Sequence, residues 1–371
     1  MQRRQRSVRH LTLFLGTAAV PSLLLLSLLL LACSDDSGPA KPGEVDKAIY
    51  GELITPVYSY ERDPVLSDAY QALKVDGNQV AHFAISWSQV EPSDEPAERD
   101  WSSFDIHVRQ AREKDVALSM VLQIVQGDSV DVPAWIGFSG FGDATLRAQL
   151  AQFFRQAGLR AYGRLDWVWL GEGFDRYLSA HPEEEEAVSR FLGAMTDSLH
   201  RSVPDVTVGI AISPASLEKS GKQAWARAVR DSLDLVGLSV FPALAGGSLA
   251  GPDAAFAALA QTAQDWGDRP FAILDSGYPS SGDVGSSEQA QAAFATRVAG
   301  WLGERPSTLV LFNWSPLHDP LPELAASIAD GRFPDDPDLR ADFLAVFSSS
   351  ALRRIDGSRK VGREPFVQDR P

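Results

Sequence analysis

Eight apolar runs of strand length recur along this chain, and segments with helical spacing of apolar residues lie between most of them. Strands that alternate with helices form parallel βαβ units, and eight such units close into a barrel. We therefore predict an α/β fold, a TIM (β/α)8 barrel. An open doubly wound sheet is the alternative, but no glycine-rich fingerprint follows the first run. The runs are residues 49–58, 80–87, 116–125, 165–171, 206–213, 233–241, 270–278 and 308–314.

The intervening helices are predicted at residues 104–114, 144–159, 183–203 and 287–304. Many of these segments begin with acidic or capping residues, as helix starts do. The acidic run Glu183 to Glu186 is interpreted as a solvated first helical turn, because the helix dipole favours negative charge there.

The first 32 residues have the pattern of a secretory signal: four arginines precede an apolar run from Leu11 to Leu31. The sequence Leu-Leu-Ala-Cys that ends at Cys33 resembles the lipobox of bacterial lipoproteins, and Cys33 is the only cysteine of the chain. The resemblance implies a lipidated Cys33 that anchors an exported protein to the cell envelope, at the outer membrane or the cell surface. An uncleaved membrane anchor is the alternative that the length of the apolar run permits.

Composition divides the rest of the chain. Residues 33–47 are rich in Ser, Asp, Gly and Pro and are predicted to be a flexible tether, followed by the barrel at residues 48–350. Residues 351–371 are polar and are predicted to be a loosely attached tail. Removing the signal removes four arginines and no acidic residue, so the net charge changes from −15 to −19. This charge argues against a nucleic-acid partner, because little basic surface remains to neutralise phosphates.

The stretch from Trp167 to Leu178 is the most informative for function. It begins as an apolar strand and passes through Gly171-Glu172-Gly173 directly into a helix start. Glu172 is thus delivered where a strand ends, which is where ligands bind in a parallel barrel. A plain turn residue between two glycines is the other interpretation of Glu172.

Other strand ends also carry carboxylates and aromatic residues, which are the groups that recognise sugars. Asp275 follows Glu172 by three βα units and is the predicted partner of Glu172 in acid/base chemistry. The six histidines lack the paired spacing of a zinc motif, so no metal is expected, and no cofactor is expected either. The predicted substrate-binding residues are Trp87, Glu91, Asp175, Tyr278, Asn313 and Trp314.

Several of these strand ends carry a family resemblance. Residues 48–320 are similar to the clan of retaining glycoside hydrolases on (β/α)8 barrels, most strongly to bacterial relatives of the arabinogalactan endo-galactanase type. The motifs that carry the resemblance are FAISWSQVEPS, WLGEGFDRYL, LVGLSVFP and LDSGYPSS. The resemblance implies a carbohydrate partner, an acid/base Glu in an Asn-Glu pair after the fourth strand, and a nucleophilic Glu after the seventh strand.

This chain departs from the clan at both positions. Glu172 matches the Asn of the pair, Gly173 matches the acid/base, and Asp275 stands where the nucleophile would be. One hypothesis is therefore a surface lipoprotein that binds carbohydrate without turning it over, since binding needs the groove and not the acid pair. The other is an active glycosidase acting on β-linked polysaccharide, with Glu172 and Asp275 as a displaced pair that works slowly and with inversion.

Overall fold

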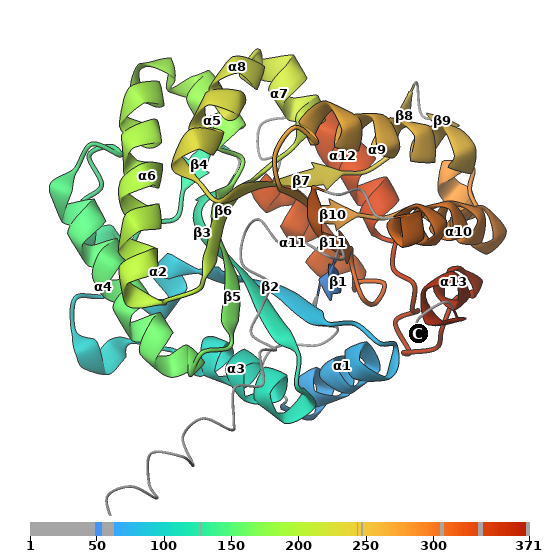
Figure 1. The fold of residues 1–371 in the computed structure, drawn as a ribbon, viewed down its shortest axis with the longest axis horizontal. Coiled ribbons are helices and arrows are strands. Elements are labelled where there is room, and N and C mark those ends of the chain that lie inside the picture. Colours follow the sequence, from blue (N-terminus) through green and yellow to red (C-terminus); the bar gives the residue numbers. More distant parts are fainter. Residues whose placement is uncertain are drawn as a thin grey trace, which may run out of the picture. The chain divides into compact units, whose positions relative to one another are not determined.

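A computed structural model of the chain describes residues 49–53, 63–126, 128–242, 244–245, 248–304, 308–332 and 337–368. Eight parallel strands form a closed barrel surrounded by helices (Figure 1). The first strand pairs with both the second and the last, and the second pairs with the third, so the ring is complete and an open sheet is excluded. The predicted fold class and all eight predicted strands are confirmed. The strands are β1 (Ile49–Leu53), β2 (Val80–Ser86), β3 (Ala117–Gln126), β5 (Leu165–Glu172), β6 (Thr207–Ile212), β7 (Leu235–Val240), β10 (Phe271–Ser276) and β11 (Leu309–Trp314).

The four predicted helices correspond to α3 (Ser102–Lys114), α4 (Ala144–Ala161), α6 (Glu185–Ser202) and α10 (Glu288–Glu304). A side-chain cap marks the start of α4, where the Asp143 side chain accepts a hydrogen bond of 2.7 Å from the Thr145 amide. The other helices are α1 (Asp63–Val75), α2 (Trp87–Val90), α5 (Phe174–Ala180), α7 (Pro214–Ser220), α8 (Gln223–Val229), α9 (Pro252–Trp266), α11 (Pro322–Arg332), α12 (Pro337–Phe347) and α13 (Glu364–Gln368). Two short antiparallel pairs add β4 (Ser129–Val130), which pairs with β3, and β8 (Leu244–Ala245) with β9 (Ser248–Leu249).

A tryptophan fills the inside of the barrel. A Cβ added at Gly209 would lie 2.7 Å from the Trp169 ring, and one at Gly237 would lie 2.8 Å from it, so both strands need glycine beside this ring. The Trp169 indole donates a hydrogen bond of 2.8 Å to the Ser119 hydroxyl, which also contacts the His82 ring at 2.8 Å. The barrel interior is therefore a packed core, and ligand space must be sought at the strand ends.

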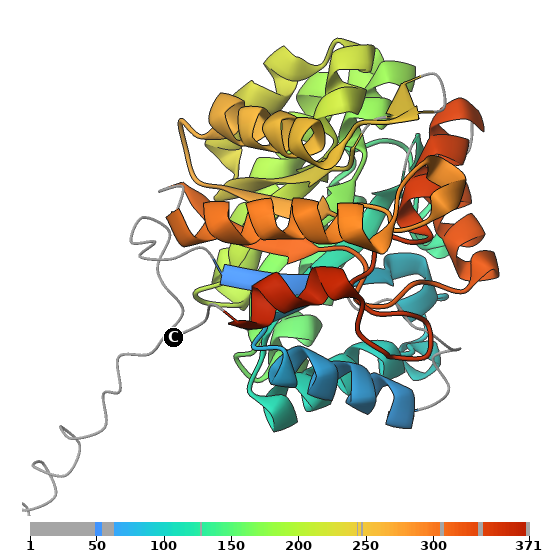
Figure 2. The ribbon, with the colours of Figure 1, turned by 90° about the vertical axis from the view of Figure 1, so that its right-hand side faces the viewer.

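The segment after residue 350 packs against the barrel, so the expectation of a loosely attached tail is wrong for the described residues up to Gln368. The C-terminal segment is drawn in dark red in Figure 2. Two of its arginines, Arg353 and Arg359, each pair at 2.5 Å with the buried carboxylate of Asp76. The Phe366 ring packs 5.4 Å from the Trp314 ring. The arginines that make the composition of this segment polar pair with Asp76, a buried carboxylate far away in the sequence. Composition alone therefore could not show that the segment is packed.

The predictions for the N-terminus fall outside the described residues. The signal, Cys33 and the tether all precede Ile49, where the description begins. Among the helices that are described, none combines the length and the apolar character needed to cross a membrane.

Candidate functional site

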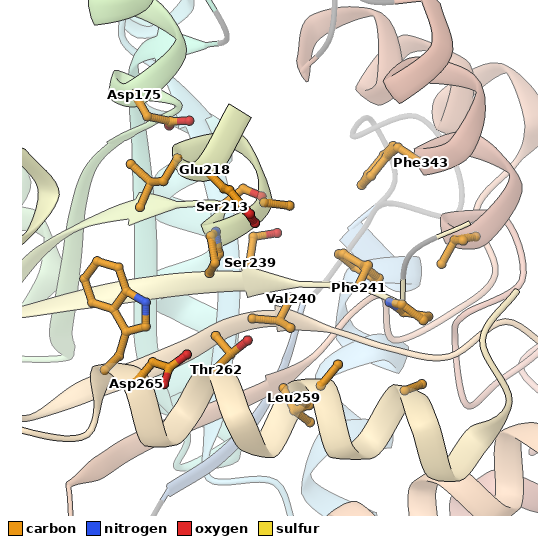
Figure 3. A pocket seen from close by; sticks show the side chains of 18 of the residues that line it. Asp175, Ser213, Glu218, Ser239, Val240, Phe241, Leu259, Thr262, Asp265 and Phe343 are labelled. Atoms are coloured by element: carbon orange, nitrogen blue, oxygen red, sulfur yellow. The ribbon is translucent and has the colours of Figure 1, made fainter. Parts of the chain in front are cut away.

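A cavity of about 700 Å³ lies at the carboxyl ends of β5, β6 and β7 and extends along α7 and α9. The strand ends contribute Glu172, Ser213 and Ser239 to its wall. Figure 3 shows Asp175, Ser213 and Glu218 on one side of the cavity and Phe241 and Phe343 on the other. The cavity thus has a polar, acidic wall and an aromatic wall.

Two glycines determine how Glu172 enters the cavity. Gly171 and Gly173 both have φ of +92°, a left-handed conformation that residues with a Cβ adopt only at a cost. A Cβ at Gly171 would also lie 3.3 Å from the Val125 amide nitrogen. Because Gly173 is the N-cap of α5, the chain passes from strand to helix within one residue and leaves the half-buried Glu172 on the cavity wall.

Asp175, in the first turn of α5, is the most desolvated carboxylate of the wall. It is 1% exposed, and neither of its carboxylate oxygens accepts a hydrogen bond from the described residues. Burial raises the pKa of Asp175, and the Ser216 hydroxyl and the Arg176 charge offset this rise only in part. The compensation of this buried charge by neighbouring groups is therefore incomplete. Asp175 lines the cavity, and its predicted role in substrate binding stays a prediction.

Asp275 occupies a different environment. It lies next to the end of β10, is 3% exposed, and accepts a hydrogen bond of 2.6 Å from the Ser315 hydroxyl. The pairing of β10 with β7 is irregular between Ile273 and Asp275, which changes the local register there. Asp275 is not among the residues that line the cavity, so this space does not bring it together with Glu172.

The three aromatic residues predicted to line the groove are instead part of the core. Trp87 and Trp314 are fully buried and Tyr278 is 2% exposed, all within the hydrophobic layer between barrel and helices. The Trp87 indole donates a hydrogen bond to the Glu91 carboxylate, and the Trp314 indole donates a hydrogen bond of 2.8 Å to the Ser350 carbonyl. The prediction was wrong because a position at a strand end does not decide whether a side chain points into the mouth or outward under a helix.

Glu91 and Asn313 are also buried away from the cavity. Glu91 accepts a hydrogen bond of 2.9 Å from Trp87 and forms an ion pair of 3.1 Å with Arg99, which stabilises the loop after α2. Asn313 is fully buried, and its amide atoms have no hydrogen-bond partner among the described residues. Neither residue lines this cavity, and their predicted role in substrate binding stays a prediction.

The cavity contains residues that sequence reasoning missed. Ser213 ends the predicted strand 206–213, so the rule that selected Glu172 could have selected it as well, and Ser239 lies two residues before the end of the predicted strand 233–241. Phe343 belongs to α12 and packs with its ring centroid 5.9 Å from that of Phe241, nearly perpendicular to it. No sequence pattern linked these two phenylalanines, because one ends a strand and the other lies on a helix far along the chain.

Nothing in the described part of the chain groups three or more His, Cys, Asp or Glu side chains in a way that could hold a metal ion. The described side chains of the cavity offer carboxylates, hydroxyls and aromatic rings to a ligand.

No protein-family model matches the chain, and no curated protein matches it either. Solved structures share its fold. A single-site variant of a family 5, subfamily 18 glycoside hydrolase from Streptomyces cattleya, in complex with Manβ1-4GlcNAc, has a TM-score of 0.64 at 16% identity, covering 88% of this chain and 82% of that chain. The exo-β-1,4-mannosidase Op5Man5 from an Opitutaceae bacterium has a TM-score of 0.63 at 15% identity, covering 87% of this chain and 59% of that chain.

A family 39 glycoside hydrolase from Bacteroides cellulosilyticus aligns with a TM-score of 0.56 at 13% identity, covering 86% of this chain and 62% of that chain. At these identities the comparison concerns architecture. The chain shares the barrel fold of family 5 and related glycoside hydrolases.

Proposed function

We propose that this protein binds carbohydrate in the cavity at the ends of β5, β6 and β7. The observation that carries the proposal is a cavity that Glu172 lines, with the carboxylates of Asp175 and Glu218 on one side and the rings of Phe241 and Phe343 on the other. Carboxylates accept hydrogen bonds from sugar hydroxyls, and aromatic faces pack against the apolar faces of sugar rings. The complexes of structural neighbours with Manβ1-4GlcNAc support an oligosaccharide as the class of ligand.

We further propose that the site binds its ligand without efficient turnover. A retaining glycosidase needs two carboxyl groups about 5 to 5.5 Å apart across the scissile bond, and an inverting one about 6.5 to 9.5 Å. Glu172 lines the cavity, whereas Asp275 is buried and hydrogen-bonded to Ser315. Gly173 occupies the position at which the retaining glycoside hydrolases that this chain resembles have their acid/base Glu. Its φ is positive, a conformation that disfavours residues with a side chain.

Slow hydrolysis is the second candidate. It is favoured by one observation: Glu172 ends β5 and Asp275 lies one residue before the end of β10, so both carboxylates are at the same end of the barrel. In that case Glu172 acts as general acid, Asp275 acts as base through water, and the anomeric configuration inverts.

The two candidates separate in one experiment. The full chain is titrated calorimetrically with β-linked oligosaccharides that include mannan, galactan and N-acetylglucosamine types, and reducing ends are assayed on the same panel. We expect saturable binding without release of reducing ends, and weaker binding by Glu172→Gln. Release that Glu172→Gln abolishes would establish the enzyme, and no binding to any glycan would refute both candidates.

We also propose that Cys33 is lipidated and tethers the protein to the bacterial cell envelope. The proposal is supported by the apolar run that precedes Ala32-Cys33 and by the absence of any other cysteine in the sequence. Cys33→Ser should move the protein from the membrane to the soluble fraction. An unmodified Cys33 in membrane-bound protein, seen by mass spectrometry, would contradict the proposal.

A further inference from the structure

The acidic wall of the cavity has an excess of negative charge. Among the described residues, Glu172 from β5, Asp175 from α5 and Glu218 from α7 line it, together with the guanidinium of Arg176. The helices α5 and α7 pack against each other, and Asp175 and Glu218 lie on the same side of the cavity (Figure 3). Three carboxylates and one guanidinium leave two negative charges in excess when all four groups are ionised.

The other guanidinium of the cavity is engaged at a different place. Arg227 donates a hydrogen bond of 3.1 Å to the Asp265 carbonyl, and its guanidinium lies 5.2 Å from the Trp266 ring centroid. Asp265 lies well away from Asp175 in Figure 3. Arg227 therefore contributes little to neutralising the acidic wall.

Asp175 supplies an independent sign that a cationic group belongs here. It lines the cavity, is 1% exposed, and accepts no hydrogen bond at either carboxylate oxygen. Native structures rarely leave buried carboxylates without donors, because the desolvated charge is costly. A ligand that brings a positively charged donor to Asp175 would complete the compensation that the Ser216 hydroxyl and the Arg176 charge provide only in part.

We propose that the carbohydrate bound in this cavity carries a free ammonium group, as in oligosaccharides that contain glucosamine, and that this ammonium pairs with Asp175. This inference rests on the proposed carbohydrate function and adds the substrate class. The remaining groups suit the rest of such a ligand. The Ser213 and Ser239 hydroxyls can bond to its hydroxyl groups, and the Phe241 and Phe343 rings present an apolar surface.

The test compares two tetramers with the same backbone and linkage, one cationic and the other neutral because its amino groups are acetylated. The full chain is titrated at low salt and pH 6.5 with a β-1,4-linked glucosamine tetramer and with the fully N-acetylated tetramer, which is neutral. We expect the cationic tetramer to bind roughly tenfold more tightly, the range of one charge-assisted hydrogen bond. The preference should shrink as salt is raised, because salt screens the ion pair.

A matched pair of variants assigns the preference to the site. Asp175→Asn should reduce the preference to about twofold or less, since a neutral amide keeps the shape but not the charge. Asp197→Asn, which removes an exposed charge of α6 outside the cavity, should keep the preference. Thermal melting is measured on both variants. If Asp175→Asn does not fold, Glu218→Gln on the exposed surface of α7 replaces it, with a smaller expected loss.

The outcomes are distinguishable. If the N-acetylated tetramer or other neutral glycans bind as tightly as the cationic tetramer, the ammonium inference is overturned while the carbohydrate function stands. If no glycan of either kind binds, the carbohydrate function fails and the inference fails with it. If the preference persists in Asp175→Asn and in Glu218→Gln, the ammonium does not bind at this wall and the assignment is wrong.

Discussion

The carboxyl ends of β5 and β10 both carry a carboxylate, but the two carboxylates differ in exposure and in hydrogen bonding. Glu172 emerges between two glycines with positive φ and lies on the wall of a cavity. Asp275 is 3% exposed and accepts a hydrogen bond from Ser315. One carboxylate therefore faces open space, whereas the other is buried and bonded to the loop that follows β11. A carboxylate at a strand end acquires a chemical role only when the surrounding side chains leave it accessible.

The aromatic residues follow the same division. Trp314, at the end of the neighbouring strand β11, packs with its ring 5.8 Å from Phe294 and 5.4 Å from Phe366. Phe241, at the end of β7, is partly exposed and faces the cavity. The β10 and β11 ends are thus structural, and the β5 to β7 ends form the candidate site.

The largest expected effect tests whether the β11 end is core. Trp314→Ala should lower the free energy of unfolding by about 3–5 kcal/mol, because it leaves a cavity in a fully buried aromatic cluster. Phe241→Ala, on the cavity side, should cost clearly less because Phe241 is only partly buried. Urea denaturation of both variants measures the difference. Equal losses would erase the distinction between the two regions.

Asp275→Ala should lower the free energy of unfolding by about 2 kcal/mol, since it leaves the buried Ser315 hydroxyl without its acceptor. Asp275→Asn keeps an acceptor oxygen and should cost less. Glycan affinity should stay the same in both variants, because Asp275 does not line the cavity. Lost affinity at unchanged stability would instead make Asp275 part of the site.

Glu172→Gln should show the opposite pattern. Loss of the charge should weaken glycan binding by about 1.5 kcal/mol, roughly tenfold, the value of a hydrogen bond to a charged group. Stability should change by less than about 0.5 kcal/mol, because the side chain is only half-buried. Calorimetric titration and urea denaturation of one preparation measure both quantities, and a destabilised variant with normal affinity would contradict the assignment.

Gly173→Ala tests the conformational basis of the β5 end. The substitution should cost about 1 kcal/mol of folding stability, because φ is +92° at this position. Gly300→Ala in α10 is the matched control: it has an open site for a Cβ and should raise stability slightly through helix propensity. If both variants are stabilised in urea denaturation, the positive φ does not constrain residue 173.

The finest distinction concerns pH. Burial raises the pKa of Asp175 in the folded protein above the ordinary value of 3.8. As the pH rises, Asp175 therefore loses its proton in the unfolded chain at a lower pH than in the folded protein. Stability is therefore lost from about that pH up to the raised pKa and stays lower above it. Glu172, Arg176 and Glu218 also face this wall, so urea denaturation is compared between the native chain and Asp175→Asn from pH 3.5 to 7. The stability of Asp175→Asn relative to the native chain should rise over this window, and a constant difference would argue against a desolvated Asp175.

Sequence periodicity predicted the barrel because each apolar run has strand length and each βα unit is a local pattern. The same reasoning located Glu172, since Gly-Glu-Gly between a strand and a helix start is readable without the structure. It also selected Asp175, which lies in the first turn of α5 on the cavity wall. These features depend on neighbours in sequence, which is why they could be predicted.

Side-chain direction and long-range pairing were decided only by the tertiary structure. Trp87 and Trp314 end or follow strands as expected, but the helices packed outside the barrel bury them. Phe343 joins the site from α12, and Asp76 holds a C-terminal segment that its composition describes as a tail. The physical reason is the same in each case: strand and helix formation follow the local pattern of apolar residues, whereas burial, access and ion pairing depend on residues brought together from far apart in the chain.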